Sequence, residues 1–201
     1  MIADVSSRRE FLAASLALAV SPARAQAAKL PVIASFSILA DIVRRVGGER
    51  VDVTALVQPG NDAHVYNPTP DDARKLAAAK LIVMNGLGFE GWIERLMKAS
   101  GAKAPVVVAT KGVKPIQGAE KRNDPHAWQN IANVKIYVAN IGEALEKADP
   151  AGAKTFETNG LAFAAELDAL EAEVRKTLDA IPPERRRIIT SHDAFGYVGA
   201  T

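Results

Sequence analysis

The fold class of this chain is decided by residues 31–57, which read PVIASFSILADIVRRVGGERVDVTALV. Two short apolar runs rich in Val and Ile, 31–36 and 51–57, have the composition of buried strands. Between them, residues 37–46 place apolar side chains at helical spacing, and a Gly-Gly pair follows as a helix stop. This order indicates a strand–helix–strand unit with two parallel strands.

The same alternation continues downstream of this unit. Two further apolar runs, 80–86 and 104–110, predict buried strands. Residues 70–79 begin with a proline and two aspartates, as helices often do, and 90–99 carry apolar side chains at helical spacing. We therefore predict an α/β fold in which helices cover both faces of a parallel sheet.

The pattern changes after a polar loop at 111–125 and a predicted helix at 131–147. From 151 to 181 there is no proline, and one apolar stripe recurs at three- and four-residue steps. Such a stripe predicts one helix of about 30 residues, roughly 45 Å long. Two interpretations are open, because this helix could pack along a single domain or could link two lobes.

The last twenty residues resemble the opening of a second βα unit. Pro182 and Pro183 end the long helix, and residues 186–192 are predicted to form a strand. A parallel strand buried on both faces needs neighbours, so we expect a second lobe that is only begun and a chain that is truncated at its C-terminus. The expected division is a first lobe at 28–150, a linking helix at 151–181 and the start of the second lobe at 182–201.

Composition limits the classes of function. The 201 residues are 48% hydrophobic and 24% charged with a net charge of +2, which is typical of a globular protein with a real core. No run of more than three basic residues is present, so we expect no nucleic-acid partner. The chain has no cysteine, which leaves histidine and carboxylate as metal ligands.

Residues 1–27 have the pattern of an export signal. A pair of arginines (Arg8-Arg9) precedes an apolar stretch at 11–20 that is too short to span a bilayer, and Ala23-Arg24-Ala25 fits a small-x-small cleavage site. The pattern predicts the twin-arginine route and a periplasmic protein without a lipid anchor. The alternative, an N-terminal helix of the fold, is disfavoured by Pro22.

The three histidines occupy similar places in the predicted fold. His64 follows the strand at 51–57 in the stretch PGNDAHVYNPTP, His126 lies in NDPHAWQN before a helix, and His192 ends the strand predicted at 186–192. Ligands in open α/β sheets bind beyond the carboxyl ends of strands. Three imidazoles and a fourth group make a tetrahedral zinc site, so these residues are our candidate metal ligands.

An aspartate accompanies each histidine, at positions 62, 124 and 193. These carboxylates could accept the second ring N–H of a ligating histidine. Equally, Asp62 and Asp124 could accept turn hydrogen bonds from the backbone while Asp193 caps a helix. Tyr66 likewise could support the His64 ring or make a turn hydrogen bond, and both tryptophans are interpreted as core residues.

Taken in this order around a long helix, PGNDAHVYNPTPDD, NDPHAW and TSHDAF resemble the periplasmic metal-binding proteins of zinc and manganese ABC transporters, the ZnuA/TroA-like cluster 9 family. The resemblance runs from about residue 30 to the last residue. It implies two βα lobes joined by a rigid helix, with a metal held between the lobes. On the matching motifs, His64, His126 and His192 are implied as the first three ligands.

The resemblance also carries expectations about ions and partners. The family's fourth ligand is a carboxylate of the second lobe, expected here beyond residue 201. Histidine stands where manganese-selective relatives tend to have glutamate, which favours Zn²⁺ over Mn²⁺, with iron behind. The implied role is a monomer that delivers its ion to an ABC permease in the inner membrane and that is not an enzyme.

Two other classes of function stay open on the residues alone. A zinc hydrolase could use three histidines and an open position for water, although the sequence contains no HExxH or similar paired motif. A surface adhesin of the same fold is the other alternative.

Overall fold

A computed structural model describes residues 28–118, 121–187 and 189–199 of the chain. The export signal predicted at 1–27 therefore lies outside the described residues. No helix in the described part of the chain combines the length and the apolar character needed to cross a membrane.

A four-stranded parallel sheet forms the centre of the fold, with the strand order β2-β1-β3-β4. The strands are β1 (Leu30–Phe36), β2 (Val51–Val57), β3 (Leu81–Met84) and β4 (Val106–Val108). All four strands predicted from the apolar runs are present, and the two later ones are shorter than predicted. The apolar residues of each strand follow one another without alternation, because helices cover both faces of the sheet and side chains on both faces are buried.

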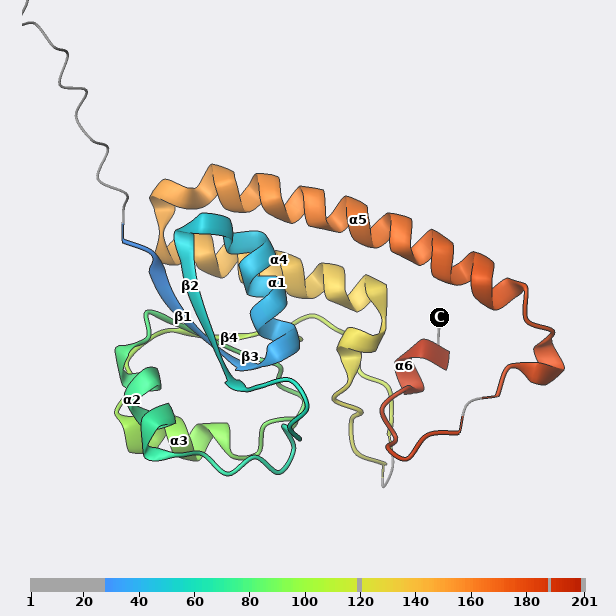
Figure 1. Ribbon diagram of the computed structural model, residues 1–201, viewed down its shortest axis with the longest axis horizontal. Coiled ribbons are helices and arrows are strands. Elements are labelled where there is room, and N and C mark those ends of the chain that lie inside the picture. The colour runs from blue at the N-terminus through green and yellow to red at the C-terminus, as the bar shows by residue number, and fades with distance from the viewer. Residues whose placement is uncertain (1–27, 119–120, 188, 200–201) are drawn as a thin grey trace, which may run out of the picture.

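The strand order reverses direction at β1, and this reversal decides where the helices lie. The chain moves from β1 to β2 on one side and then returns past β1 to β3 and β4. Because parallel crossovers are right-handed, α1 (Ser37–Gly47) covers one face, and α2 (Pro70–Ala78) and α3 (Ile93–Ser100) cover the other (Figure 1). A reversal of this kind opens a crevice at the carboxyl ends of the strands.

Two long helices complete the face on which α1 lies. Helix α4 (Ile131–Ala148) packs against β3, β4 and α1, and α5 (Ala153–Asp179) packs against α4 and α1. Asn159 of α5 donates a 3.0 Å hydrogen bond to the carbonyl of Val46 at the end of α1. The predicted long helix is thus present, close to the expected 151–181.

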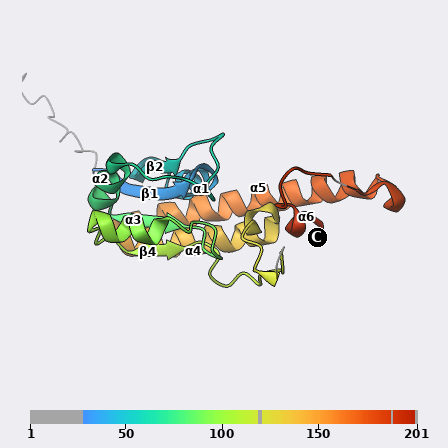
Figure 2. The ribbon, with the colours of Figure 1, turned by 90° about the horizontal axis from the view of Figure 1, so that it is seen from below.

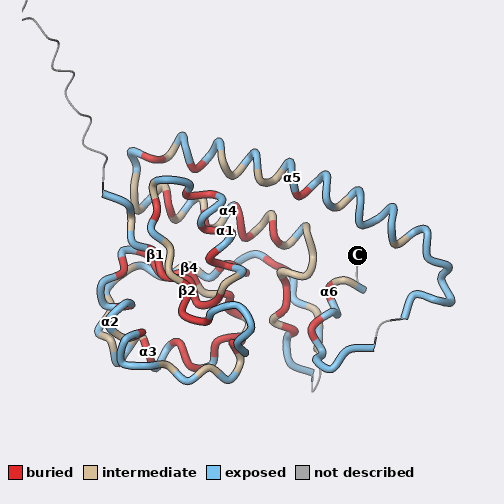
Figure 3. The backbone as a smooth tube through the Cα atoms, viewed as in Figure 1, coloured by how far each residue is buried: buried red, intermediate tan, exposed pale blue. Residues whose placement is uncertain are grey.

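Only the first part of α5 is covered by the lobe. Phe156 and Leu167 are buried, whereas Leu170 and Val174 on the same apolar stripe are 47% and 37% exposed. The distal part of the helix runs past the sheet and α4 in Figure 2, and most of its length is exposed in Figure 3. The helix therefore packs along one lobe for half its length and extends beyond that lobe for the rest.

The prediction of a strand at 186–192 is wrong for the described residues of that stretch. These residues form turns and irregular chain, and Ile189 is 99% exposed. A strand needs a neighbour to bond its backbone groups, and no described strand lies beside this segment. The stretch instead leads from a 3₁₀ turn (Pro183–Arg185) to the one-turn helix α6 (Gly196–Gly199).

Candidate metal centre

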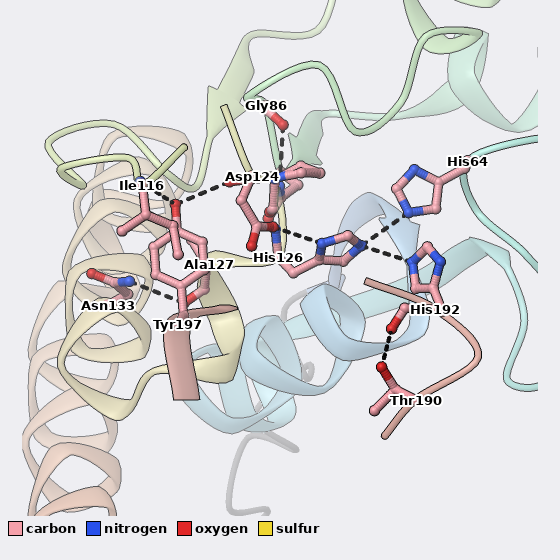
Figure 4. Close-up of polar contacts among 12 residues, drawn as sticks. His64, Gly86, Ile116, Asp124, His126, Ala127, Asn133, Thr190, His192 and Tyr197 are labelled. Atoms are coloured by element: carbon pink, nitrogen blue, oxygen red, sulfur yellow. Dashed lines mark hydrogen bonds and ion pairs between the residues drawn. The ribbon is translucent and has the colours of Figure 1, made fainter. Parts of the chain in front are cut away.

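The three histidines, which lie far apart in the sequence, meet at one point of the structure. The Nε2 atom of His126 lies 3.0 Å from Nε2 of His64 and 3.1 Å from Nε2 of His192 (Figure 4). One nitrogen from each ring can be chosen so that all three lie within 4.8 Å of one another. The structure thus brings together the three residues that the sequence names as candidate metal ligands.

His64 lies in the loop after β2, at the crevice where the strand order reverses. Its backbone N–H donates a 2.8 Å hydrogen bond to Asp62 Oδ1, which fixes the turn. The residue before it is also held, because Trp92 Nε1 donates a 2.7 Å bond to the carbonyl of Ala63. The prolines and turn residues therefore restrict the conformation of this loop, which presents a single imidazole to the site.

His126 is the buried member of the trio, at 5% exposure. Asp124 Oδ1 accepts hydrogen bonds from both its backbone N–H, at 2.9 Å, and its ring Nδ1, at 2.7 Å. Since an ionised carboxylate can only accept, Nδ1 carries a proton, and Nε2 is the ring atom that faces the other two histidines.

The spacing of the nitrogen atoms matches an N–H···N hydrogen bond between rings, and it is also close to the separation that a shared cation would impose. Zinc holds histidine nitrogens at about 2.0–2.1 Å, which places two tetrahedral ligands about 3.3 Å apart. The observed 3.0 and 3.1 Å are close to that separation.

Burial keeps one of the rings in its metal-binding form. Burial lowers the pKa of His64 below its usual value, and the neighbouring His126 and His192 lower it further, against the raising effect of Asp62. A lowered pKa leaves the ring unprotonated near neutral pH. An unprotonated imidazole is the form that binds a metal.

Aromatic side chains make the wall behind the histidines. Phe89 contacts the ring of His64 edge-on, with centroids 4.5 Å apart, and Trp128 lies 5.3 Å from the ring of His126. On the open side, His64, His192 and Asp124 border a cavity of about 710 Å³. A second cavity, of about 310 Å³, is lined by Phe89, Trp128 and all three histidines.

The structure decides which of the alternative roles the neighbouring residues take. Asp62 makes the turn hydrogen bond only, whereas Asp124 makes the turn hydrogen bond and also holds the ring of its histidine. Tyr66 donates to Asp72 at 2.9 Å, so its hydroxyl supports the start of α2. Trp92 is buried in the core as predicted, and its ring N–H also binds the loop of His64.

Sequence reasoning missed two residues that hold the loop of His126. Asn85, just after β3, is fully buried and donates a 2.8 Å hydrogen bond to the carbonyl of Pro125. Its side-chain oxygen accepts a 2.6 Å bond from the hydroxyl of Tyr137 in α4. The second residue is Tyr197 of α6, whose hydroxyl donates to the carbonyl of Asp124 at 3.0 Å. No spacing pattern marks such contacts, because they join elements distant in the sequence.

Comparison with known proteins identifies a family whose model matches most of this chain. Residues 32–201 match the family model ZnuA, described as zinc-uptake complex component A, periplasmic. Among curated proteins, the chain is 37% identical over 191 residues to the iron-binding protein YfeA of Yersinia pestis, covering 93% of this chain and 61% of that protein. It is 36% identical over 171 residues to the manganese-binding lipoprotein MntA of Halalkalibacterium halodurans, covering 85% of this chain and 57% of that protein.

Solved structures agree with this family. A manganese-bound periplasmic metal-binding protein from Candidatus Liberibacter asiaticus is 32% identical with a TM-score of 0.79, and the match covers 86% of this chain and 65% of that one. The zinc-bound AdcA of Streptococcus pneumoniae, at 24% identity and a TM-score of 0.77, shares the fold. The chain spans about three fifths of the length of the curated relatives it matches.

Proposed function

The chain belongs to the ZnuA family of periplasmic zinc-uptake components, and from this premise we propose that it captures a divalent metal ion and delivers it to the permease of an ABC transporter. One observation carries the proposal most directly. Three imidazole nitrogens converge on a single point, and a buried carboxylate holds the innermost ring from behind. Metal-binding histidines are commonly oriented in this way.

We assign the ligands to His64, His126 and His192 through their Nε2 atoms. Each comes from a different segment of chain, so one ion would tie three segments together. Among the described residues, the cluster contains these three nitrogens and no carboxylate. In the proposal, a carboxylate beyond residue 201 takes the fourth position of a tetrahedral ion.

Zinc is the preferred ion of the proposal. Three neutral imidazoles form a nitrogen-rich site, and manganese favours oxygen ligands. The relatives named for manganese and iron make those two ions the alternatives, in that order. The ranking is tested by titrating metal-free protein with Zn²⁺, Mn²⁺ and Fe²⁺ under equal conditions and comparing the dissociation constants. A tighter constant for Mn²⁺ than for Zn²⁺ would reverse the order.

The family consists of binding components of transporters and not of enzymes, which removes support from the hydrolase interpretation. A hydrolase would also need a general base at the metal. The carboxylate next to the site, Asp124, is buried and already bonded twice by His126. An adhesin role has no observation in its favour.

The remaining parts of the proposal concern the rest of the molecule. We propose that residues 28–150 form a metal-binding lobe, 151–181 the helix that links it to a second lobe, and 182–201 the start of that lobe. We also propose that residues 1–27 direct export to the periplasm by the twin-arginine route and that the mature protein acts as a monomer.

The ligand assignment is tested by replacing each histidine with alanine in turn. We expect each of His64→Ala, His126→Ala and His192→Ala to weaken zinc binding by more than about 100-fold, because loss of a ligand costs more than loss of the groups that orient it. Competition with a chelator of known affinity measures the dissociation constant, and circular dichroism of the metal-free variants checks that they are folded.

The matched control is Asn61→Ala, which changes an exposed residue of the same loop as His64. Its zinc affinity should equal that of the unmodified protein. Folded variants that retain full zinc affinity after all three histidine substitutions would refute the assignment.

A further inference from the structure

We propose that Tyr197 is a positioning residue that fixes the segment of His192 against the loop of His126, so that the three imidazoles converge before an ion arrives. The inference rests on the proposed metal site and adds a residue to it that is not a ligand.

His192 belongs to a segment with little structure of its own. The described residues from 189 to 195 are exposed apart from the buried Ala194. The carbonyl of His192 accepts bonds from Thr190 Oγ1, at 2.9 Å, and from the backbone N–H of Ala194, at 3.0 Å. Both bonds lie within the segment, so they shape its turn but do not attach it to the lobe, and the ring itself reaches the lobe through the 3.1 Å contact of its Nε2 with His126.

Tyr197 provides an attachment. Although α6 is a single turn near the end of the described chain, this side chain is buried to 3% exposure. Its hydroxyl donates a 3.0 Å hydrogen bond to the carbonyl of Asp124 and accepts a 3.3 Å bond from the backbone N–H of Ile116 (Figure 4).

The hydroxyl of Tyr197 takes the place of one of the two backbone hydrogen bonds expected between Asp124 and Ile116. Asp124 and Ile116 face each other across a short antiparallel turn that is also bridged between Gln117 and Asn123. The N–H of Asp124 donates directly to the carbonyl of Ile116 at 2.9 Å. In a regular antiparallel pair the second bond would run from the N–H of Ile116 to the carbonyl of Asp124. The hydroxyl of Tyr197 is inserted between these two groups and satisfies both.

The residue that Tyr197 binds is the one that orients His126. The carbonyl of Asp124 accepts from Tyr197, while its carboxylate holds the ring and backbone of His126. A single residue thus joins the segment of the third histidine to the support of the second. Holding the His192 segment against this loop in the metal-free protein lowers the entropy lost on binding.

Close packing at Gly196 supports the same attachment independently of the hydroxyl. A Cβ atom at this position would lie 2.9 Å from both Asp124 Oδ2 and Ile116 Cδ1. The backbone of α6 therefore approaches the Asp124 loop as closely as a glycine allows. At Gly199, in the same helix, an added Cβ would meet no atom within 4 Å.

The test uses three single variants and Zn²⁺ as the probe. Tyr197→Phe keeps the ring and removes the hydroxyl, and we expect it to raise the zinc dissociation constant about tenfold, since two buried hydrogen bonds are lost. Gly196→Ala should raise it at least about fivefold by pushing α6 away from the loop. Gly199→Ala is the matched control and should leave it unchanged.

A double-mutant cycle separates positioning of His192 from a general effect on the fold. In a His192→Ala background, the effect of Tyr197→Phe should vanish, because the ring that it positions is gone. In a His64→Ala background the effect should persist. The side-chain NMR signals of His192 in the metal-free Tyr197→Phe protein should move toward those of an exposed histidine, while the Nδ1–H signal of His126 should stay in place.

Each outcome bears on one of the two proposals. Failure of the unmodified protein to bind zinc removes the proposed function and this inference with it. If the unmodified protein binds zinc and His192→Ala weakens binding, but Tyr197→Phe changes nothing or costs the same in every background, the inference alone is overturned. Loss of affinity only in Tyr197→Leu, and not in Tyr197→Phe, would likewise refute a role for the hydroxyl.

Discussion

At the scale of single residues, two aspartates in equivalent places have different partners. Asp62 and Asp124 each lie two residues before a histidine, and each accepts a hydrogen bond from that histidine's backbone N–H. Only Asp124 also accepts the ring Nδ1–H. It is buried with His126, so its negative charge acts on the ring with little screening by solvent.

We therefore predict that Asp124→Asn weakens zinc binding about tenfold, because the amide can keep the contact but not the charge that makes the imidazole a stronger ligand. Asp62→Asn keeps the turn and removes no ring contact, so its effect should be within about twofold. Chelator competition at pH 7.5 measures both constants. Equal effects of the two substitutions would show that the ring contact to Asp124 has no influence on affinity.

At the scale of elements, the start of α2 shows how the loop of His64 is anchored at its far end. Thr69 and Asp72 form a capping box, in which each side chain accepts from the other's backbone N–H. Asp72 is buried, and it also accepts from the hydroxyls of Thr69 and Tyr66. The Pro68 and Pro70 on either side of Thr69 restrict the chain further.

Removal of this cap should destabilise the lobe. We predict that Thr69→Ala lowers the free energy of unfolding by about 1 kcal/mol, since one helix N–H and the buried Asp72 each lose a partner. Denaturant titration of the metal-free protein measures the change. Asp71→Asn, in the exposed first turn of the same helix, should cost clearly less, and an equal cost at both positions would contradict the role of the cap.

The long helix α5 offers a second comparison within one element. Leu167 and Leu170 belong to the same apolar stripe, but Leu167 is 7% exposed against the lobe and Leu170 is 47% exposed. Salt bridges from Arg45 to Glu166 and from Lys135 to Asp168 hold the helix on α1 and α4 at the same level. The lobe therefore covers the apolar stripe of α5 as far as Leu167 and leaves Leu170 exposed.

Substitution of each leucine by alanine should show where the lobe stops covering α5. Leu167→Ala removes buried methyl groups and should lower the free energy of unfolding by about 2–3 kcal/mol. Leu170→Ala should change it by no more than about 0.5 kcal/mol, as at other surface positions. Urea denaturation of both variants at one pH tests the difference, and similar losses would mean that the lobe covers more of α5 than the structure indicates.

At the scale of the whole molecule, one ion pair joins the start of β2 to the turn between α4 and α5. Arg50, just before β2, donates to both carboxylate oxygens of Asp149, at 2.7 and 3.0 Å, between α4 and α5. The guanidinium lowers the pKa of Asp149 below its usual value by hydrogen bonding and by charge, while burial opposes the shift. The pair closes a loop of about a hundred residues that contains β2, β3 and β4, while β1 precedes it.

This pair predicts a pH dependence of stability. A carboxylate with a lowered pKa in the folded state stabilises the protein above its unfolded pKa, near 3.9, and this stabilisation is lost as pH falls through the lower folded value. Asp149→Asn should therefore unfold at a lower denaturant concentration than the unmodified protein at pH 5–7. The difference between the denaturation midpoints of the two proteins should become smaller below about pH 3.9. A difference that stays constant from pH 7 to pH 3 would contradict this role of the ion pair.

Much of the architecture could be predicted from local patterns. The four strands and the helices around them follow from apolar runs and helical spacing, and their predicted places agree with the structure. The strand at 186–192 could not be judged in this way. Its apolar residues favour a strand locally, but a strand exists only where a neighbour bonds its backbone, and the described structure places none beside it.

The candidate site shows the same division. The sequence by itself determined which side chains are able to bind a metal, because a chain with three histidines and no cysteine has few choices. It also determined the parallel sheet at whose carboxyl edge His64 lies. Only the tertiary structure decided that the three Nε2 atoms meet, that Asp124 and not Asp62 holds a ring, and that Tyr197 fastens the last segment to the loop of His126. The physical reason is that periodicity and turn chemistry act over a few residues, whereas the contacts of His126 with His64 and His192 and of Tyr197 with Asp124 join residues more than 60 positions apart. The contact of Asp124 with the ring of His126 is local in sequence, but both residues are buried only once the core has packed.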